Sequence, residues 1–81
     1  MRRKIDKIDE QIFLLLKRRI EISRKIGEIK RSKGLPIRDL EREEKKYKQI
    51  TLKALELKID PRYVKDVYRK IIDMSVHAQK Q

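Results

Sequence analysis

Apolar side chains recur every three or four residues through the first third of the chain, which is the spacing of one face of an α-helix. The stripe holds seven apolar residues, with Arg19 in the middle: Ile5, Ile8, Ile12, Leu15, Ile22, Ile26 and Ile29. The first helix-breaking residue inside it is Gly27, which a helix tolerates at a cost of about 1 kcal/mol. The pattern therefore predicts a helix from residue 2 to about residue 31.

Two further helices follow from start and stop signals. Residues 32–38 (SKGLPIR) predict a loop, because glycine and proline both interrupt helices. Asp39 is a candidate N-cap for a second helix that should end near Leu57 or Lys58. Asp60 followed by Pro61 predicts the start of a third helix, which should continue close to the C-terminus. With no strand pattern and no repeat, we expect a single all-α domain over residues 1–81, with one long and two shorter helices.

The unequal helix lengths predict an assembly. About thirty helical residues extend over about 45 Å, whereas the two shorter helices would each reach about 27 Å. The shorter helices cannot cover the whole apolar stripe of the long one, and an uncovered stripe of that length favours association. We therefore expect an intertwined homodimer built on the first helix.

Each helix also carries polar residues on or beside its apolar face. They are Arg19, Lys30, Glu43, Ser75 and Gln79. A charge in such a position is costly to bury unless another group pairs with it. Two interpretations stay open from the periodicity. Arg19 and Glu43 could pair and fix the register of the helices, or the five residues could line a wet, cationic pocket inside the bundle.

The net charge of +11 limits the choice of partner only in part. Acidic residues are interleaved with basic ones, as in residues 41–46 (EREEKK), and this is typical of a solvated helix surface. Attraction of a small anionic ligand is compatible with it. Only four aromatic residues are present (three Tyr and one Phe), so few side chains could stack on nucleic-acid bases. We therefore expect no nucleic-acid partner.

Several chemistries are excluded by composition. The chain has no cysteine and one histidine, so we expect no disulfide, no metal site and no cofactor. No apolar run approaches the roughly 20 residues that cross a bilayer and no signal peptide opens the chain, so we expect a cytoplasmic protein with no membrane partner. No nucleophile–base pair or phosphate-binding glycine loop is apparent. An enzyme with this sequence would work by positioning and electrostatics.

Three segments resemble the all-helical class of chorismate mutase: RRKIDKIDEQIFLLLKRR, IGEIKRSKGLPIRDLEREE and IIDMSVHAQ. The family pattern has an arginine at the start of the first helix, a second in mid-helix and a lysine eleven residues later. An Asp-x-x-Arg-Glu motif follows the first loop, and Ser-x-x-x-Gln closes the third helix. The matching residues here are Arg2, Arg19, Lys30, Asp39, Arg42, Glu43, Ser75 and Gln79.

The resemblance implies that the anion is chorismate, a dicarboxylate that rearranges to prephenate in phenylalanine and tyrosine biosynthesis. It implies that Arg19 and Arg2 grip the carboxylates, with Arg2 supplied by the partner chain of a homodimer. Lys30 and Gln79 would donate hydrogen bonds to the ether oxygen, so Lys30, Gln79 and Arg19 are the expected catalytic residues.

The remaining residues of the pattern are expected to bind the substrate. Glu43, helped by the backbone at Asp39, would accept a hydrogen bond from the ring hydroxyl. Arg42 would support the carboxylate end, and Ser75 the ring carboxylate.

Two alternatives are retained. An isochorismate pyruvate-lyase would use the same fold and a similar cationic pocket. A non-catalytic helical dimerisation or regulatory module would need the charges only to fix the register of its helices.

Overall fold

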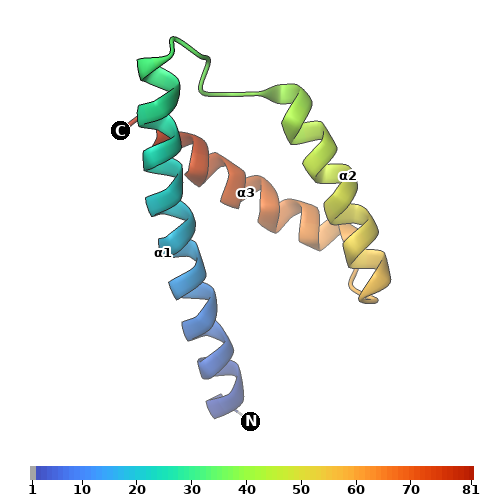
Figure 1. The fold of residues 1–81 in the computed structure, drawn as a ribbon. Coiled ribbons are helices and arrows are strands. Elements are labelled where there is room, and N and C mark those ends of the chain that lie inside the picture. The colour runs from blue at the N-terminus through green and yellow to red at the C-terminus, as the bar shows by residue number, and fades with distance from the viewer. Residues whose placement is uncertain (1) are drawn as a thin grey trace.

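The computed structural model describes residues 2–81, and every regular element in that range is an α-helix (Figure 1). Helix α1 runs over Arg2–Ser32, α2 over Leu40–Glu56 and α3 over Pro61–Gln79. The predicted all-α architecture of one long and two shorter helices is therefore confirmed, with bounds within about two residues of the expected ones.

The three helices form an open arrangement in which α3 is the connecting element. Helix α3 packs against α1 and against α2, whereas α1 and α2 diverge from the loop that joins them (Figure 1). The C-terminal end of α3 lies beside the C-terminal half of α1, and its N-terminal end follows α2. The longest dimension of the chain, 48 Å, is close to the length of α1 itself. The N-terminal half of α1 therefore extends beyond the other two helices.

The predicted helix starts are formed by side-chain caps. Asp39 accepts a hydrogen bond from the backbone N–H of Arg42 at 3.1 Å, and Asp60 accepts one from the backbone N–H of Arg62 at 2.9 Å. Each cap supplies a partner to one of the N–H groups that the first turn of a helix leaves free. Pro61 follows Asp60 at the first helical position, as predicted.

Helices α1 and α2 end in the same backbone motif. Gly34 follows α1 with φ 67°, and Lys58 follows α2 with φ 58°. In each case the next residue donates its N–H to a carbonyl of the last helical turn, Leu35 to Lys30 and Ile59 to Ala54, both at 2.8 Å. These are the bonds of a Schellman cap, which needs a residue in the left-handed conformation. Glycine adopts that conformation freely at position 34, whereas Lys58 adopts it against the usual preference of a residue with a Cβ.

The buried core of the chain is small. Its apolar members are Ile50 and Ala54 of α2 and Ile72 and Ala78 of α3. The face of α1 that packs on α3 consists of residues adjoining the predicted stripe, among which Ser23 and Gly27 are buried. A Cβ added to Gly27 would overlap the carbonyl group of Gln79 and lie 2.7 Å from its Cα, so glycine is required by the close approach of the two helices. This is the packing reason for a glycine in the interior of a long helix.

The predicted apolar stripe of α1 remains uncovered in the single chain. Its isoleucines and leucine are all exposed, from 37% at Ile26 to 61% at Leu15. Residues 2–15 of α1 are exposed without exception. None of the helices within residues 2–81 has an apolar stretch long enough to cross a membrane.

Candidate active site

The contact between Arg19 and Ser75 joins α1 to α3 at the predicted site. Arg19 Nε donates a hydrogen bond to Ser75 Oγ at 3.0 Å. Ser75 is buried and Arg19 is partly buried, so this end of the guanidinium is held inside the helix interface. Neither terminal amino group of Arg19 has a hydrogen-bond partner among residues 2–81. The planar fork is therefore fixed through Nε, and its terminal N–H groups remain available for an anion.

The Arg19–Glu43 pair, one of the two interpretations of the polar seam, is not formed within the chain. Glu43 instead accepts two hydrogen bonds from Arg38, from Nε to Oε2 and from Nη2 to Oε1, each at 3.0 Å. The Glu43 side chain is 15% exposed and that of Arg38 is 51% exposed. The hydrogen bonds from Arg38 to Glu43, with the attraction between the two charges, raise the pKa of Arg38 above its ordinary value.

Arg38 is a residue that sequence reasoning missed. It lies in the loop before α2, outside any helical periodicity, so no pattern of apolar positions could indicate it. Its Nη2 also lies 4.0 Å from a carboxylate oxygen of Asp73 on α3. Arg38 therefore places one positive charge between acidic groups of two helices.

Lys30 connects the end of α1 to the first loop. Its Nζ donates a hydrogen bond to the backbone carbonyl of Ile37 at 2.8 Å. An ammonium group has three N–H donors, so two are left for other acceptors. Asp39, two residues after Ile37, is the N-cap of α2. Arg42, the next predicted site residue along the chain, is exposed.

Gln79 is the last residue of α3 and packs against Gly27 of α1. Its side-chain oxygen, Oε1, is buried and has no hydrogen-bond partner in the described chain. A buried amide oxygen without a partner is uncommon in folded proteins. Gln79 thus has a polar group at the α1–α3 interface that the fold itself does not use.

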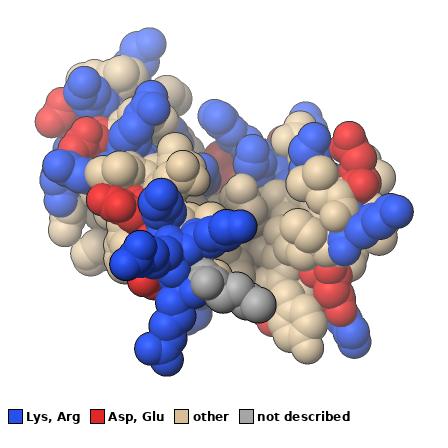
Figure 2. Space-filling model, turned by 90° about the horizontal axis from the view of Figure 1, so that it is seen from below, with Lys and Arg blue, Asp and Glu red and all other residues tan. Residues whose placement is uncertain are grey.

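The chain does not bring Arg2 to the other site residues. Arg2 is exposed at the first position of α1, and seventeen helical residues separate it from Arg19 by about 25 Å. Figure 2 shows that Lys and Arg gather at this end of the molecule. The first turn of α1 contains no acidic residue, although the positive end of a helix favours one.

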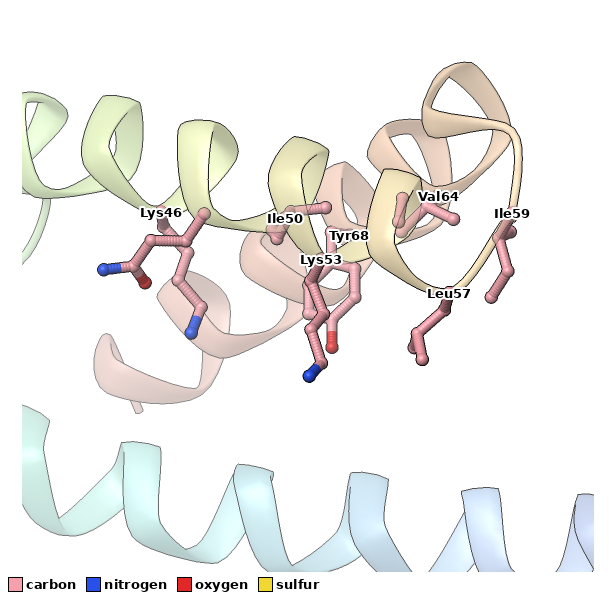
Figure 3. Close-up of a pocket in the computed structure, with 9 residues that line it drawn as sticks. Lys46, Ile50, Lys53, Leu57, Ile59, Val64 and Tyr68 are labelled. Carbon is pink, nitrogen blue, oxygen red and sulfur yellow. The ribbon is translucent and has the colours of Figure 1, made fainter.

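The hollows on the surface of residues 2–81 include two that are lined mainly by α2 and α3. The first, of about 460 Å³, lies between α2 and α3, and its lining includes Ile50, Leu57 and Val64. Figure 3 shows the side chains of Lys53, on α2, and of Leu57, the C-cap of α2, directed toward the side on which α1 lies. The second, of about 680 Å³, is lined by Arg38, Glu43 and Asp73 together with neighbouring residues of α2 and α3.

The predicted site residues therefore fall into separate groups. Arg19, Ser75 and Gln79 lie along the contact of α1 with α3, and Lys30 lies less than one turn beyond Gly27 on α1. Glu43 lies on α2 and lines the second hollow, and Arg2 is remote from both. The first hollow contains none of the predicted site residues.

Comparison with known proteins adds independent information. Residues 1–80 match the family described as chorismate mutase type II. A chorismate mutase of Methanocaldococcus jannaschii is 33% identical over 81 residues, which are 100% of this chain and 82% of that relative. A bifunctional chorismate mutase/prephenate dehydratase of Aquifex aeolicus is 33% identical over 84 residues, and the match covers 100% of this chain and 23% of the relative. The T-protein of Enterobacter agglomerans is 33% identical over 79 residues, with 98% of this chain and 21% of the relative covered.

The last two relatives are much longer proteins, of which this chain spans less than a quarter. The family match, in contrast, extends over nearly the whole chain, and the first relative is matched over most of its own length. The resemblance noted in the sequence is thus confirmed, and the chain belongs to the chorismate mutase type II family of isomerases.

Proposed function

We propose that this chain catalyses the rearrangement of chorismate to prephenate, as a step of phenylalanine and tyrosine biosynthesis in the cytoplasm. The observation that carries the proposal is the state of Arg19. Its guanidinium is held at the α1–α3 interface by Ser75, a neutral residue, and its terminal N–H groups have no partner in the described chain. A partly buried cation without a carboxylate partner is suited to bind an anionic ligand. Membership of the family indicates which anion.

The reaction suits a site without a nucleophile. It is an intramolecular Claisen rearrangement, in which the C–O bond of the ether breaks as a C–C bond forms, with no proton transfer and no covalent intermediate. The protein must hold the reactive conformer of the substrate and stabilise the ether oxygen as negative charge develops there. An acceleration of about 10⁶-fold requires about 8 kcal/mol of preferential transition-state stabilisation.

Each site residue has a role in this scheme. Arg19 and Arg2 bind the two carboxylates, and Lys30 and Gln79 donate hydrogen bonds to the ether oxygen. Lys30 has two N–H groups beyond the one that it gives to Ile37, and these support its role as a donor. Gln79 would donate through the N–H groups of its side-chain amide.

The other three side chains, with one backbone group, bind the periphery of the substrate. Glu43 accepts from the ring hydroxyl, assisted by the backbone at Asp39. Ser75 supports the ring carboxylate, and Arg42 supports the carboxylate end.

The active form is proposed to be a homodimer with shared sites. The support is the exposed stripe of α1, which runs from Ile5 to Ile29 and has no cover within the chain. The apolar hollow between α2 and α3 is a second uncovered surface, and it contacts no part of α1 in its own chain. If the α1 of a second copy packed on the α1 stripe and on the hollow between α2 and α3, both surfaces would be buried. This packing would also bring a second Arg2 toward Arg19.

The experiment is an assay of the purified protein with chorismate, followed by the loss of its ultraviolet absorbance and by identification of prephenate. A mutase converts chorismate to prephenate without releasing pyruvate. An isochorismate pyruvate-lyase would leave chorismate nearly unchanged and release pyruvate from isochorismate. A non-catalytic module would consume neither compound, so each alternative has its own outcome.

A further inference from the structure

The C-terminal end of α3 is attached to α1 by an arginine that has no place in the scheme above. Arg31 Nη1 donates a hydrogen bond to the backbone carbonyl of Gln79 at 2.5 Å, and its Nη2 lies 3.5 Å from the carbonyl of Gln81. Arg24, seven residues earlier on α1, donates from Nε to the side-chain oxygen of Gln81 at 3.3 Å. Two cations of α1 therefore meet this end of the chain, Arg31 at the last residue of α3 and Arg24 at Gln81, two residues beyond it.

This position matches the electrostatics of a helix end. The last carbonyls of an α-helix have no N–H partner within the helix, and they concentrate partial negative charge there. Arg31 provides both a donor for one of these carbonyls and a positive charge beside them. The terminal turn would otherwise be prone to fray, and Gln79 is the last helical residue.

The side chain of Gln79 depends on this backbone anchor. Its Oε1 makes no hydrogen bond within residues 2–81, so no side-chain contact of that atom fixes the amide. Gly27 permits the backbone of Gln79 to lie directly against α1, where any Cβ would displace it. The location of the amide is thus set by where the end of α3 rests on α1.

We propose that Arg31 is a positioning residue for Gln79: by binding the Gln79 carbonyl it holds the amide where the ether oxygen of the substrate must meet it. The inference rests on the proposed function, because it gives Gln79 the role of donor to that oxygen. Arg31 itself does not touch the substrate. Because the hydrogen bond to the ether oxygen strengthens as charge develops, a misplaced amide lowers kcat more than it raises KM.

The test uses Arg31→Met, which keeps an apolar stem and removes the donors and the charge. We expect kcat to fall about 10-fold with KM within about twofold, since small displacements of a catalytic group reduce rates this strongly. Arg31→Lys, which keeps the charge but offers a single ammonium in place of the fork, should recover part of the loss. Arg24→Met is the matched control, since Arg24 also bonds the end of the chain but not Gln79, and its kcat should stay within about twofold of the parent.

The decisive comparison repeats Arg31→Met in a Gln79→Ala background. If Arg31 acts through Gln79, its removal should there change kcat by less than about twofold, because the group that it positions is absent. An equal loss of kcat in both backgrounds, no loss in either, or the same loss from Arg24→Met would overturn the inference while leaving the mutase activity intact. A parent protein that does not convert chorismate would instead overturn the proposed function itself.

Discussion

Arg38 and Glu43 form a two-point ion pair across the start of α2, with both N–O distances at 3.0 Å. Within residues 2–81 the same geometry occurs once more, between Arg62 and Asp60, where Nε and Nη2 donate at 3.2 and 2.9 Å. The first pair lies at a predicted site residue, and the second lies at the start of α3, between its N-cap and its first turn. The two pairs allow a local effect on the site to be separated from a general effect of losing an ion pair.

Arg38→Ala should impair substrate binding, because the mostly buried carboxylate of Glu43 loses the group that orients it toward the ring hydroxyl. We expect KM to rise by about 10- to 100-fold, because a hydrogen bond to a charged group contributes about 1.5–3 kcal/mol. Arg62→Ala, the matched control, should leave KM within about twofold. Steady-state kinetics measure both, and equal effects of the two substitutions would contradict a specific role for Arg38.

Arg19→Ala should reduce kcat/KM by at least about 10²-fold, because the substrate loses a two-point carboxylate contact in a partly buried site. Its only hydrogen bond within residues 2–81 is to Ser75, so the fold should survive its removal. Circular dichroism would check that the helices remain. A fully active variant would remove Arg19 from the site, and an unfolded one would show that the arginine serves the fold.

Gln79→Glu should introduce a pH dependence that the parent lacks. A neutral amide donates at any ordinary pH, so kcat/KM of the parent should be flat from about pH 5 to 8. A carboxylate at position 79 would face developing negative charge, whereas the protonated carboxyl can donate, so activity should rise as the pH falls toward about 4 to 5. The pH–rate profiles of both proteins decide the matter. If the two profiles coincide, Gln79 is not the donor.

Arg2→Ala and Arg19→Ala should complement each other if each site is shared between chains. The two inactive variants are unfolded and refolded together, so that random pairing makes about half of the dimers mixed. One site of a mixed dimer then holds both substitutions and the other holds neither, so about a quarter of all sites should recover. If every site used its own chain's Arg2, each would keep one substitution. Activity that stays at the parental level after verified exchange would rule out the shared site.

Asp60→Asn should destabilise the protein at neutral pH but not at strongly acidic pH. The hydrogen bonds from the Arg62 side chain and backbone lower the pKa of Asp60 below its ordinary value of 3.8. A lowered pKa in the folded state means stability that is present above 3.8 and lost as the pH falls through the folded value. The variant should therefore unfold at a lower temperature than the parent at pH 7, and the difference should shrink toward pH 2. A difference independent of pH would show that the charge of Asp60 contributes nothing.

The sequence by itself determined the helices and their ends. Asp39, Asp60 and Pro61 act within one turn of the residues that they cap, so their effect can be read without any long-range contact. The length of α1 and the period of its apolar stripe are local properties of the same kind. The exposed stripe agrees with the prediction that the single chain cannot cover it, and the homodimer itself stays a prediction.

Only the tertiary structure decided which polar residues meet. Periodicity placed Arg19, Glu43 and Ser75 on apolar faces and left open whether Arg19 pairs with Glu43 or lines a cationic pocket with the other polar residues. The choice of Ser75 depends on how α3 crosses α1, and that crossing depends on Gly27, whose missing side chain admits the backbone of Gln79. The roles of Arg38 and Arg31 could not be predicted from the sequence. The loop before α2 brings Arg38 to Glu43, and the end of α3 brings Gln79 to Arg31. A side chain's partner is set by the distance between elements, and no helical repeat encodes that distance.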